Sequence, residues 1–214
     1  MRCLAASITR LKEFVMAEET LIDDMLKGEL SALYQAGDRH YHNLTHIKAM
    51  LALADEYRAL LDDPGAVETA IWFHDAVYDS RAKDNEAKSA EMAEKSLAGR
   101  ADPHRLARIV AMINATATHQ LPALGDERAL NDAALLLDMD LAILGADPAA
   151  FDAYEKAVRQ EYGWVEEPMW RAGRAAVLKT FLARPVIFHT QAFRDRFEAR
   201  ARENLDRSLQ ALQG

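Results

Sequence analysis

The stretch Ala70-Ile71-Trp72-Phe73-His74-Asp75 places a histidine and an aspartate directly after four apolar residues. It lies in a largely apolar segment, residues 65–78, that we expect to form a helix. An imidazole and a carboxylate are costly to bury in apolar surroundings unless a partner compensates them. Two distant residues, His46 and Asp140, are candidate partners. A divalent metal ion bound by all four side chains would offset that cost.

The composition is that of an ordinary globular protein rich in helix-forming residues. Of 214 residues, 50% are hydrophobic and 28% are charged, and there are only 9 glycines and 6 prolines. The length suits one domain, and abundant Ala, Leu, Glu and Arg favour helices over sheets. The formal net charge is -8 and no basic stripe offsets it, so a nucleic-acid backbone is not an expected partner.

The ends of the chain and its cysteine usage exclude several classes of protein. The single cysteine, Cys3, excludes a disulfide framework and a cysteine-rich zinc site. No segment approaches a membrane span, and charged residues interrupt residues 1–15 where a signal peptide would be apolar. We therefore expect a cytoplasmic protein with no membrane partner, and oligomer formation stays open. Residues 1–15 are either an upstream extension of the reading frame, with Met16 as the natural start, or an ordinary first helical turn.

Helical periodicity and capping signals divide most of the chain into helices. Asp102-Pro103 and Asp147-Pro148 each combine an N-cap residue with proline at the first helical position, and Asp84 is a further candidate N-cap. No strand pattern or internal repeat is present. The sequence therefore predicts an all-α, single-domain helical bundle. Its expected helices cover residues 44–61, 65–78, 84–97, 103–119, 130–144, a segment from 148, 168–184 and about 191–212.

The four candidate ligands fall on three of these helices. Adjacent residues such as His74 and Asp75 are about 100° apart on a helix, so both reach one ion only near a helix end or beside its axis. His46 begins one expected helix and Asp140 lies within another, which predicts a site between helices packed side by side. Imidazole and carboxylate donors suit Mn, Fe, Co, Ni, Zn or Mg without selecting firmly among them.

The order His, His-Asp, Asp resembles the HD superfamily of metal-dependent phosphohydrolases, in particular a bacterial branch described as predicted metal-dependent HD phosphohydrolases. The likeness implies an HD-type helical metal-binding domain over residues 16–214 and, by analogy, hydrolysis of a phosphoester, but it supplies no substrate. The segments that carry it are Tyr41-His42-Asn43-Leu44-Thr45-His46, Trp72-Phe73-His74-Asp75-Ala76-Val77-Tyr78-Asp79, Asp84-Asn85-Glu86, Leu137-Asp138-Met139-Asp140-Leu141-Ala142-Ile143-Leu144-Gly145, Phe181-Leu182-Ala183-Arg184-Pro185-Val186-Ile187-Phe188 and Ala201-Arg202-Glu203-Asn204-Leu205.

Asp138 competes with Asp140 for the fourth ligand position. The two residues are about 200° apart on a helix, so they cannot both point at one site without distortion. The register of the superfamily resemblance favours Asp140 as the ligand. Asp138 then remains a candidate for supporting a ligand from behind.

Several residues near the ligand motifs are candidates for catalysis and binding. A carboxylate of Asp79 or Glu86 would act as general acid or base toward a water molecule, or alternatively supports a helix end. His119 ends an expected helix where the wider superfamily often places another histidine, which implies a phosphate contact or a second-metal ligand. His42, four residues before His46, supports the ligands, binds the metal itself, or lies on the surface.

A phosphate-directed site also needs positive charge. Arg39, Arg81 and Lys83 flank the ligand motifs, and Arg171 and Arg174 share one face of the expected helix 168–184. We select Lys83 and Arg174 as substrate-binding candidates, because cationic side chains match phosphate oxygens. The alternative is that these side chains make exposed ion pairs of little energetic consequence.

The expected function is metal-dependent hydrolysis of a small phosphoester, for example a nucleotide, by activated water. The sequence contains no Gly-x-Ser-x-Gly elbow and no glycine-rich phosphate loop, which argues against a covalent serine mechanism and a P-loop. Two other classes stay open. One is a di-iron HD-fold oxygenase, for which His42 and His119 would supply extra ligands. The other is a non-catalytic HD protein that binds a nucleotide or another ligand.

Overall fold

The computed structural model describes residues 21–213, which form helices and contain no strand, so the all-α prediction is confirmed for this part of the chain. Residues 1–15, with their two interpretations, lie outside it. Within residues 21–213 no helix combines the length and the apolar character needed to cross a membrane. The α-helices are α2 (Asp24–Leu33), α3 (Leu44–Glu56), α4 (Pro64–Phe73), α5 (Asn85–Leu97), α6 (Pro103–Ala115), α7 (Glu127–Leu141), α8 (Pro148–Glu161), α9 (Glu167–Leu182), α10 (Gln191–Phe193) and α11 (Ala199–Gln213).

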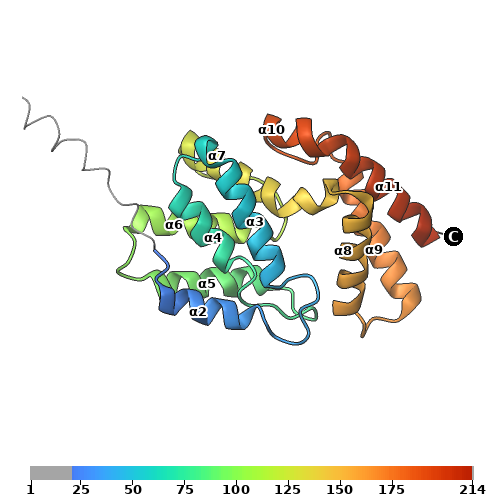
Figure 1. The fold of residues 1–214 in the computed structure, drawn as a ribbon, viewed down its shortest axis with the longest axis horizontal. Coiled ribbons are helices and arrows are strands. Elements are labelled where there is room, and N and C mark those ends of the chain that lie inside the picture. The colour runs from blue at the N-terminus through green and yellow to red at the C-terminus, as the bar shows by residue number, and fades with distance from the viewer. Residues whose placement is uncertain (1–20, 214) are drawn as a thin grey trace, which may run out of the picture.

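The helices gather in two groups (Figure 1). In the first group α4 packs against α3, α5, α6 and α7, and α2, which was not predicted, lies beside them. In the second group α9 packs against α11, and a 3₁₀ turn at Ala142–Gly145 joins α7 to α8 and α11. A continuous apolar core runs through both groups, from Leu30 in α2 to Leu205 in α11. The candidate ligands belong to the first group, and a cavity beside them is lined by residues of both groups.

Helix α4 is the central element of the first group. The Asp63 side chain accepts a hydrogen bond from the Ala66 N–H, and Pro64 occupies the first turn, which fixes where the helix begins. The residues from Ala66 to Phe73 are all buried apart from Glu68. Because α4 is buried on nearly every side, it shows little amphipathic pattern, and its sequence is almost uniformly apolar.

The predicted helix 65–78 is wrong at its C-terminal end, because α4 ends at Phe73. The Arg39 guanidinium stabilises the turn that follows: it donates hydrogen bonds to the carbonyl oxygens of Asp75 (2.6 Å) and Ala76 (2.8 Å). Those two carbonyls therefore face a side chain from another segment instead of a following helical turn. Arg39, which the sequence marked as a cation near the ligand motifs, holds this turn in place.

Other predicted boundaries also differ from the structure. The Gly145 backbone lies so close to Phe197 that an added Cβ would sit 2.6 Å from the Phe197 carbonyl oxygen, so this 3₁₀ turn requires glycine. The predicted helix 103–119 ends at Ala115, where a series of turns begins. The predicted helix 44–61 divides into α3 and a 3₁₀ turn. The predicted helix 130–144 starts earlier, at Glu127, and ends in a 3₁₀ turn. The predicted helix 191–212 divides into α10, a π-helical segment and α11.

The three predicted N-caps have different outcomes. Asp102 accepts hydrogen bonds from two backbone N–H groups in the first turn of α6, so that prediction is confirmed. The side chains of Asp84 and Asp147 make no such bond. Asp84 instead pairs with Lys88 at 2.9 Å, and Asp147 pairs with Arg200 of α11 at 3.0 Å. A basic partner within reach competes with the helix N-terminus for each carboxylate.

Candidate metal centre

Two imidazoles and a carboxylate meet in the interior of the first group. His46 lies in the first turn of α3, His74 caps the end of α4, and Asp75 follows it. The His46 Nε2 atom lies 3.3 Å from His74 Nε2 and 4.0 Å from Asp75 Oδ2, and His74 Nε2 lies 3.1 Å from Asp75 Oδ2. All three residues are buried. Their atoms are close enough together to hold one metal ion.

Asp140, near the C-terminus of α7, brings a fourth donor atom beside this group. Its Oδ1 atom lies 3.2 Å from His46 Nε2 and 3.8 Å from His74 Nε2. Ligand atoms about 2.1 Å from one ion lie roughly 3.0–3.4 Å apart at octahedral or tetrahedral angles. The spacing of Asp140 from both imidazoles is close to that range. The adjacent pair lies at a helix end, as the sequence geometry required.

The His74 imidazole is oriented by the backbone. Its Nδ1 atom lies 2.9 Å from the carbonyl oxygen of Ile71, to which it donates a hydrogen bond when Nδ1 carries the proton. In that tautomer the lone pair of Nε2 faces His46 and the carboxylates. A carbonyl behind a histidine is the usual arrangement around metal ligands, because it fixes both the tautomer and the ring orientation. The donor set therefore fits a divalent metal ion.

Electrostatics at this centre favour a positive charge. Burial alone would lower the pKa of His74, but the charge of Asp75 and a hydrogen bond to it raise that pKa to about 9. Burial would raise the pKa of Asp140, but hydrogen bonds from His119 and His46 hold it well below its usual range. Both shifts follow from buried carboxylates that attract cationic partners.

The structure separates Asp138 from Asp140. The Asp138 carboxylate is fully buried and accepts hydrogen bonds from the His189 N–H (2.6 Å), the Thr190 N–H (2.7 Å) and the Thr190 hydroxyl (2.6 Å). It therefore anchors the start of α10 on the far side of α7. Asp138 supports the fold there, and only Asp140 of the two lies beside the imidazoles.

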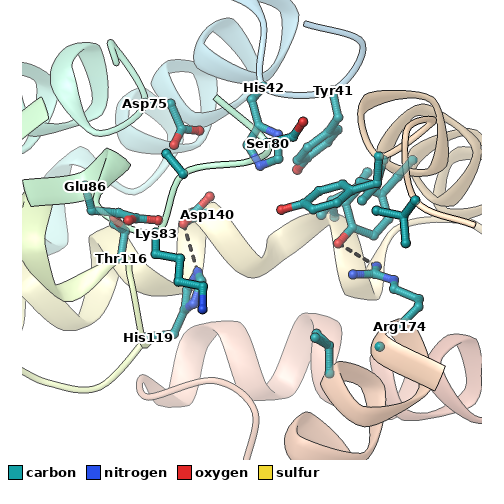
Figure 2. Close-up of a pocket in the computed structure, with 18 of the residues that line it drawn as sticks. Tyr41, His42, Asp75, Ser80, Lys83, Glu86, Thr116, His119, Asp140 and Arg174 are labelled. Atoms are coloured by element: carbon teal, nitrogen blue, oxygen red, sulfur yellow. Dashed lines mark hydrogen bonds and ion pairs between the residues drawn. The ribbon is translucent and has the colours of Figure 1, made fainter. Parts of the chain in front are cut away.

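The His119 ring contacts Asp140 directly (Figure 2), with its Nε2 atom 2.9 Å from Asp140 Oδ2. Its backbone φ of 51° lies in the left-handed region, and it is the one non-glycine residue among residues 21–213 with a positive φ. Arg184 and His189 both donate hydrogen bonds to its carbonyl oxygen, at 3.3 and 3.2 Å. Glycine is the usual residue at such a position, and histidine is among the few other residues that adopt this conformation with some frequency.

His42 is held by Glu161, a residue that the sequence did not identify. Glu161, the last residue of α8, accepts hydrogen bonds from His42 Nδ1 (2.7 Å), from the Tyr41 N–H (2.6 Å) and from the Tyr78 hydroxyl (2.8 Å). The His42 ring also stacks on Tyr78, with centroids 4.3 Å apart. One carboxylate thus fixes the loop before α3 and the loop after α4. No local pattern marks Glu161, because 119 residues separate it from His42.

Changing Glu161 to glutamine should destabilise the protein in a pH-dependent way. Burial would raise the pKa of Glu161, but the hydrogen bond and charge of His42 lower it from 4.5 to about 2. A depressed carboxyl pKa stabilises the fold above pH 4.5, and that contribution, on the order of 3 kcal/mol, is lost as the pH falls toward 2. Chemical denaturation across this range should show the difference between wild type and Glu161→Gln shrinking as the pH falls. The exposed Glu166→Gln is the control, and a constant difference would contradict the assignment.

A cavity of about 640 Å³ opens beside the centre, between the two groups of helices. His42, His74, Asp75, Asp140 and His119 line it, as do the predicted residues Glu86, Lys83 and Arg174.

Two of the sequence-predicted residues near this cavity are engaged elsewhere. Asp79 does not line the cavity, and its carboxylate accepts a hydrogen bond from the Arg81 N–H at 2.9 Å. Arg174 lines the cavity, but its guanidinium pairs with Glu155 and donates to the Tyr154 hydroxyl at 2.8 Å. Lys83 makes no ion pair with any residue in the described part of the chain and stays exposed. Glu86 and Lys83 are therefore the better placed of these candidates.

Comparison with known proteins adds no relative: no family model, no curated protein and no solved structure matches this chain. The functional interpretation therefore draws on the geometry of the centre, on the cavity beside it and on the order of the candidate ligands along the chain.

Proposed function

We propose that this chain is a metal-dependent phosphohydrolase of the HD type that hydrolyses a small phosphoester. The observation that carries the proposal is the buried His46–His74–Asp75 group with Asp140 beside it. His74, Asp75 and Asp140 line a cavity large enough for a small-molecule ligand. The order of all four residues along the chain, which resembles the HD superfamily, supports the proposal. These four side chains would hold one ion, and their nitrogen and oxygen donors suit several divalent metals.

When bound, a divalent ion would polarise a phosphoryl oxygen and lower the pKa of a water molecule toward neutrality. The chain's own residues would then orient the ester and move protons. Lys83 and His119 line the cavity near Asp140 and are suited to contact phosphate oxygens (Figure 2). The Glu86 carboxylate also lines the cavity and is suited to accept the proton of the attacking water.

His42 is suited to protonate the leaving oxygen. Glu161 binds its Nδ1 atom, so the ring is held in one orientation on the cavity wall. Burial would lower the pKa of His42, but the charge of Asp75 and the hydrogen bond to Glu161 raise it. The proton would pass from Nε2 to the ester oxygen as its bond to phosphorus breaks, which yields an alcohol and inorganic phosphate.

Phosphate release by the metal-reconstituted protein tests the proposal. Protein stripped with a chelator and reloaded with Mn²⁺, Fe²⁺, Co²⁺, Ni²⁺, Zn²⁺ or Mg²⁺ is assayed against a panel of phosphomonoesters. Hydrolysis that depends on added metal is expected. No phosphate release with any of these metals, in protein shown to be folded, would refute the proposal.

The oxygenase alternative is favoured by one observation, the contact of His119 with Asp140. A second ion would need further ligands, and His42, whose Nδ1 atom is held by Glu161, would have its Nε2 atom to offer. Two irons per chain together with oxygen uptake would favour the oxygenase over the hydrolase.

His119→Gly should separate stability from function. Glycine relieves the left-handed strain at this position, which would stabilise the fold by about 1 kcal/mol, but it removes the imidazole beside Asp140. We expect an unchanged or higher melting temperature, retention of one metal ion, and a clearly lower kcat/KM for phosphate release. His119→Asn, which tolerates the same backbone conformation, is the matched variant. Full activity in both variants would show that the imidazole has no role in the reaction.

A further inference from the structure

The wall of the cavity formed by α9 is apolar along most of its length. Met169, Gly173, Val177 and Phe181 follow one another at intervals of four residues, so they share one face of the helix, and all four line the cavity. At 1.5 Å per residue this apolar face is about 18 Å long. Helix α9 also packs against α11, which holds it in place.

We call this surface of Met169, Gly173, Val177 and Phe181 the α9 wall. It includes exposed apolar side chains, whereas most large apolar side chains in the described part of the chain are buried. The exposed fractions are 72% for Met169, 48% for Trp164 in the preceding loop and 44% for Val177. Gly173 lies between Met169 and Val177, and a Cβ added there would meet no atom within 4 Å. Exposed apolar side chains gathered along one cavity mark a binding surface for apolar groups.

Two polar groups along this wall, the Arg174 guanidinium and the Trp164 indole N–H, already have partners inside the protein. The Arg174 guanidinium is engaged by Glu155 and by the Tyr154 hydroxyl, which are 19 and 20 residues away along the chain. The Trp164 indole N–H donates to Ser80 Oγ at 3.0 Å. A ligand group rich in hydroxyls or amide edges would lose its hydration here without recovering hydrogen bonds, which is costly. An apolar group would lose no hydrogen bonds on binding here.

The α9 wall leads toward the metal centre. The ring of Phe181, its last residue, lies 5.9 Å from the His119 ring, and His119 contacts Asp140. Lys83 and His119 lie together near Asp140, whereas Arg174 lies on the opposite side of the cavity (Figure 2). The cavity is therefore lined by charged and polar side chains near the metal centre and by apolar side chains along α9, which is a pattern that fits an amphipathic ligand.

We propose that the natural substrate is a phosphomonoester of an extended apolar alcohol, with its phosphate at the metal centre and its hydrocarbon chain along the α9 wall. This inference rests on the proposed function for the phosphate end and on the α9 wall for the remainder. It distinguishes the substrate from a nucleotide, whose sugar hydroxyls and base edges would need hydrogen-bond partners, because the Arg174 guanidinium and the Trp164 indole N–H are already engaged within the protein.

The test measures binding separately from turnover. Butyl-, hexyl-, octyl- and decylphosphonate, which are not hydrolysed, are titrated below their micelle concentrations into protein with and without Mn²⁺. Two of the three tryptophans, Trp164 and Trp170, line the cavity, so their fluorescence reports occupancy. We expect the dissociation constant to fall by up to about fourfold for each added methylene, with or without metal. Nucleoside monophosphates should bind more weakly than decylphosphonate.

A matched pair of glycine variants locates the bound chain. Gly173→Leu fills the open space on the α9 wall, and Gly28→Leu on the exposed face of α2 is the control, since both glycines are helical with free space around the added Cβ. Leucine has the higher helix propensity, so neither change should unfold the protein. We expect Gly173→Leu to weaken decylphosphonate binding by about tenfold or more and Gly28→Leu to leave it unchanged.

The outcomes distinguish this inference from the proposed function. A dissociation constant independent of chain length, tighter binding of nucleoside monophosphates, or equal effects of Gly28→Leu and Gly173→Leu would overturn the inference. Chain-length dependence that is present while added metal changes no affinity and supports no phosphate release would uphold the α9 wall and refute the hydrolase.

Discussion

A variant in which His74 and Asp75 are both changed to alanine is expected to bind no divalent metal, whereas the wild type binds about one ion per chain. The two side chains are half of the candidate donor set, and they lie 3.1 Å apart in the interior. A site that joins α3, α4 and α7 holds metal only in the folded state, so metal should stabilise the wild type. At a metal concentration a thousandfold above Kd this stabilisation is about 4 kcal/mol, or roughly 10 °C in melting temperature.

Metal analysis and thermal unfolding with and without metal measure this effect. The control changes an exposed histidine and an exposed aspartate, His104 and Asp55, to alanine, and it should keep the full metal-dependent shift. Equal metal content in the wild type and in the His74/Asp75 double variant would rule out the candidate centre.

The two aspartates of α7 should behave in opposite ways. Asp138→Ala removes the acceptor for the His189 N–H, the Thr190 N–H and the Thr190 hydroxyl, and leaves these partly buried groups without it. An unpaired buried polar group costs about 1–3 kcal/mol, so the melting temperature should fall by roughly 10 °C. Asp140→Ala instead removes a donor atom 3.2 Å from His46 Nε2, and should abolish metal binding and phosphate release.

The comparison uses the same three measurements on both variants: metal content, melting temperature without metal, and phosphate release. Asp138→Ala should retain most of its metal binding at a temperature where it is folded. Loss of metal in Asp138→Ala with retention in Asp140→Ala would show that the assigned register of α7 is wrong by two residues.

The sequence predicted what depends on local rules. The Asp102-Pro103 signal marked the start of α6, because a side-chain acceptor and a proline act within one helical turn. The two-residue spacing of Asp138 and Asp140 showed that they point in different directions, and the structure places them on different partners. Helical periodicity was enough for the all-α class, because most of these helices have one apolar face.

What the sequence could not predict depends on contacts between distant segments. Arg39 sets the end of the turn after α4 through the carbonyl oxygens of Asp75 and Ala76, which are 36 and 37 residues away. Glu161 holds His42 across 119 residues, and nothing near it in the sequence distinguishes it from an exposed carboxylate. Arg174 looked available for phosphate, but its charge is satisfied by Glu155 within the second group of helices.

The most direct test of the central claim follows the oxygen atom of the attacking water. Metal-loaded protein is given a phosphomonoester in water enriched in oxygen-18, and the released phosphate and alcohol are analysed by mass spectrometry. If water attacks phosphorus at the centre formed by His46, His74, Asp75 and Asp140, the label appears in the phosphate and the alcohol stays unlabelled. Label in the alcohol, or oxygen uptake without phosphate release, would contradict the account.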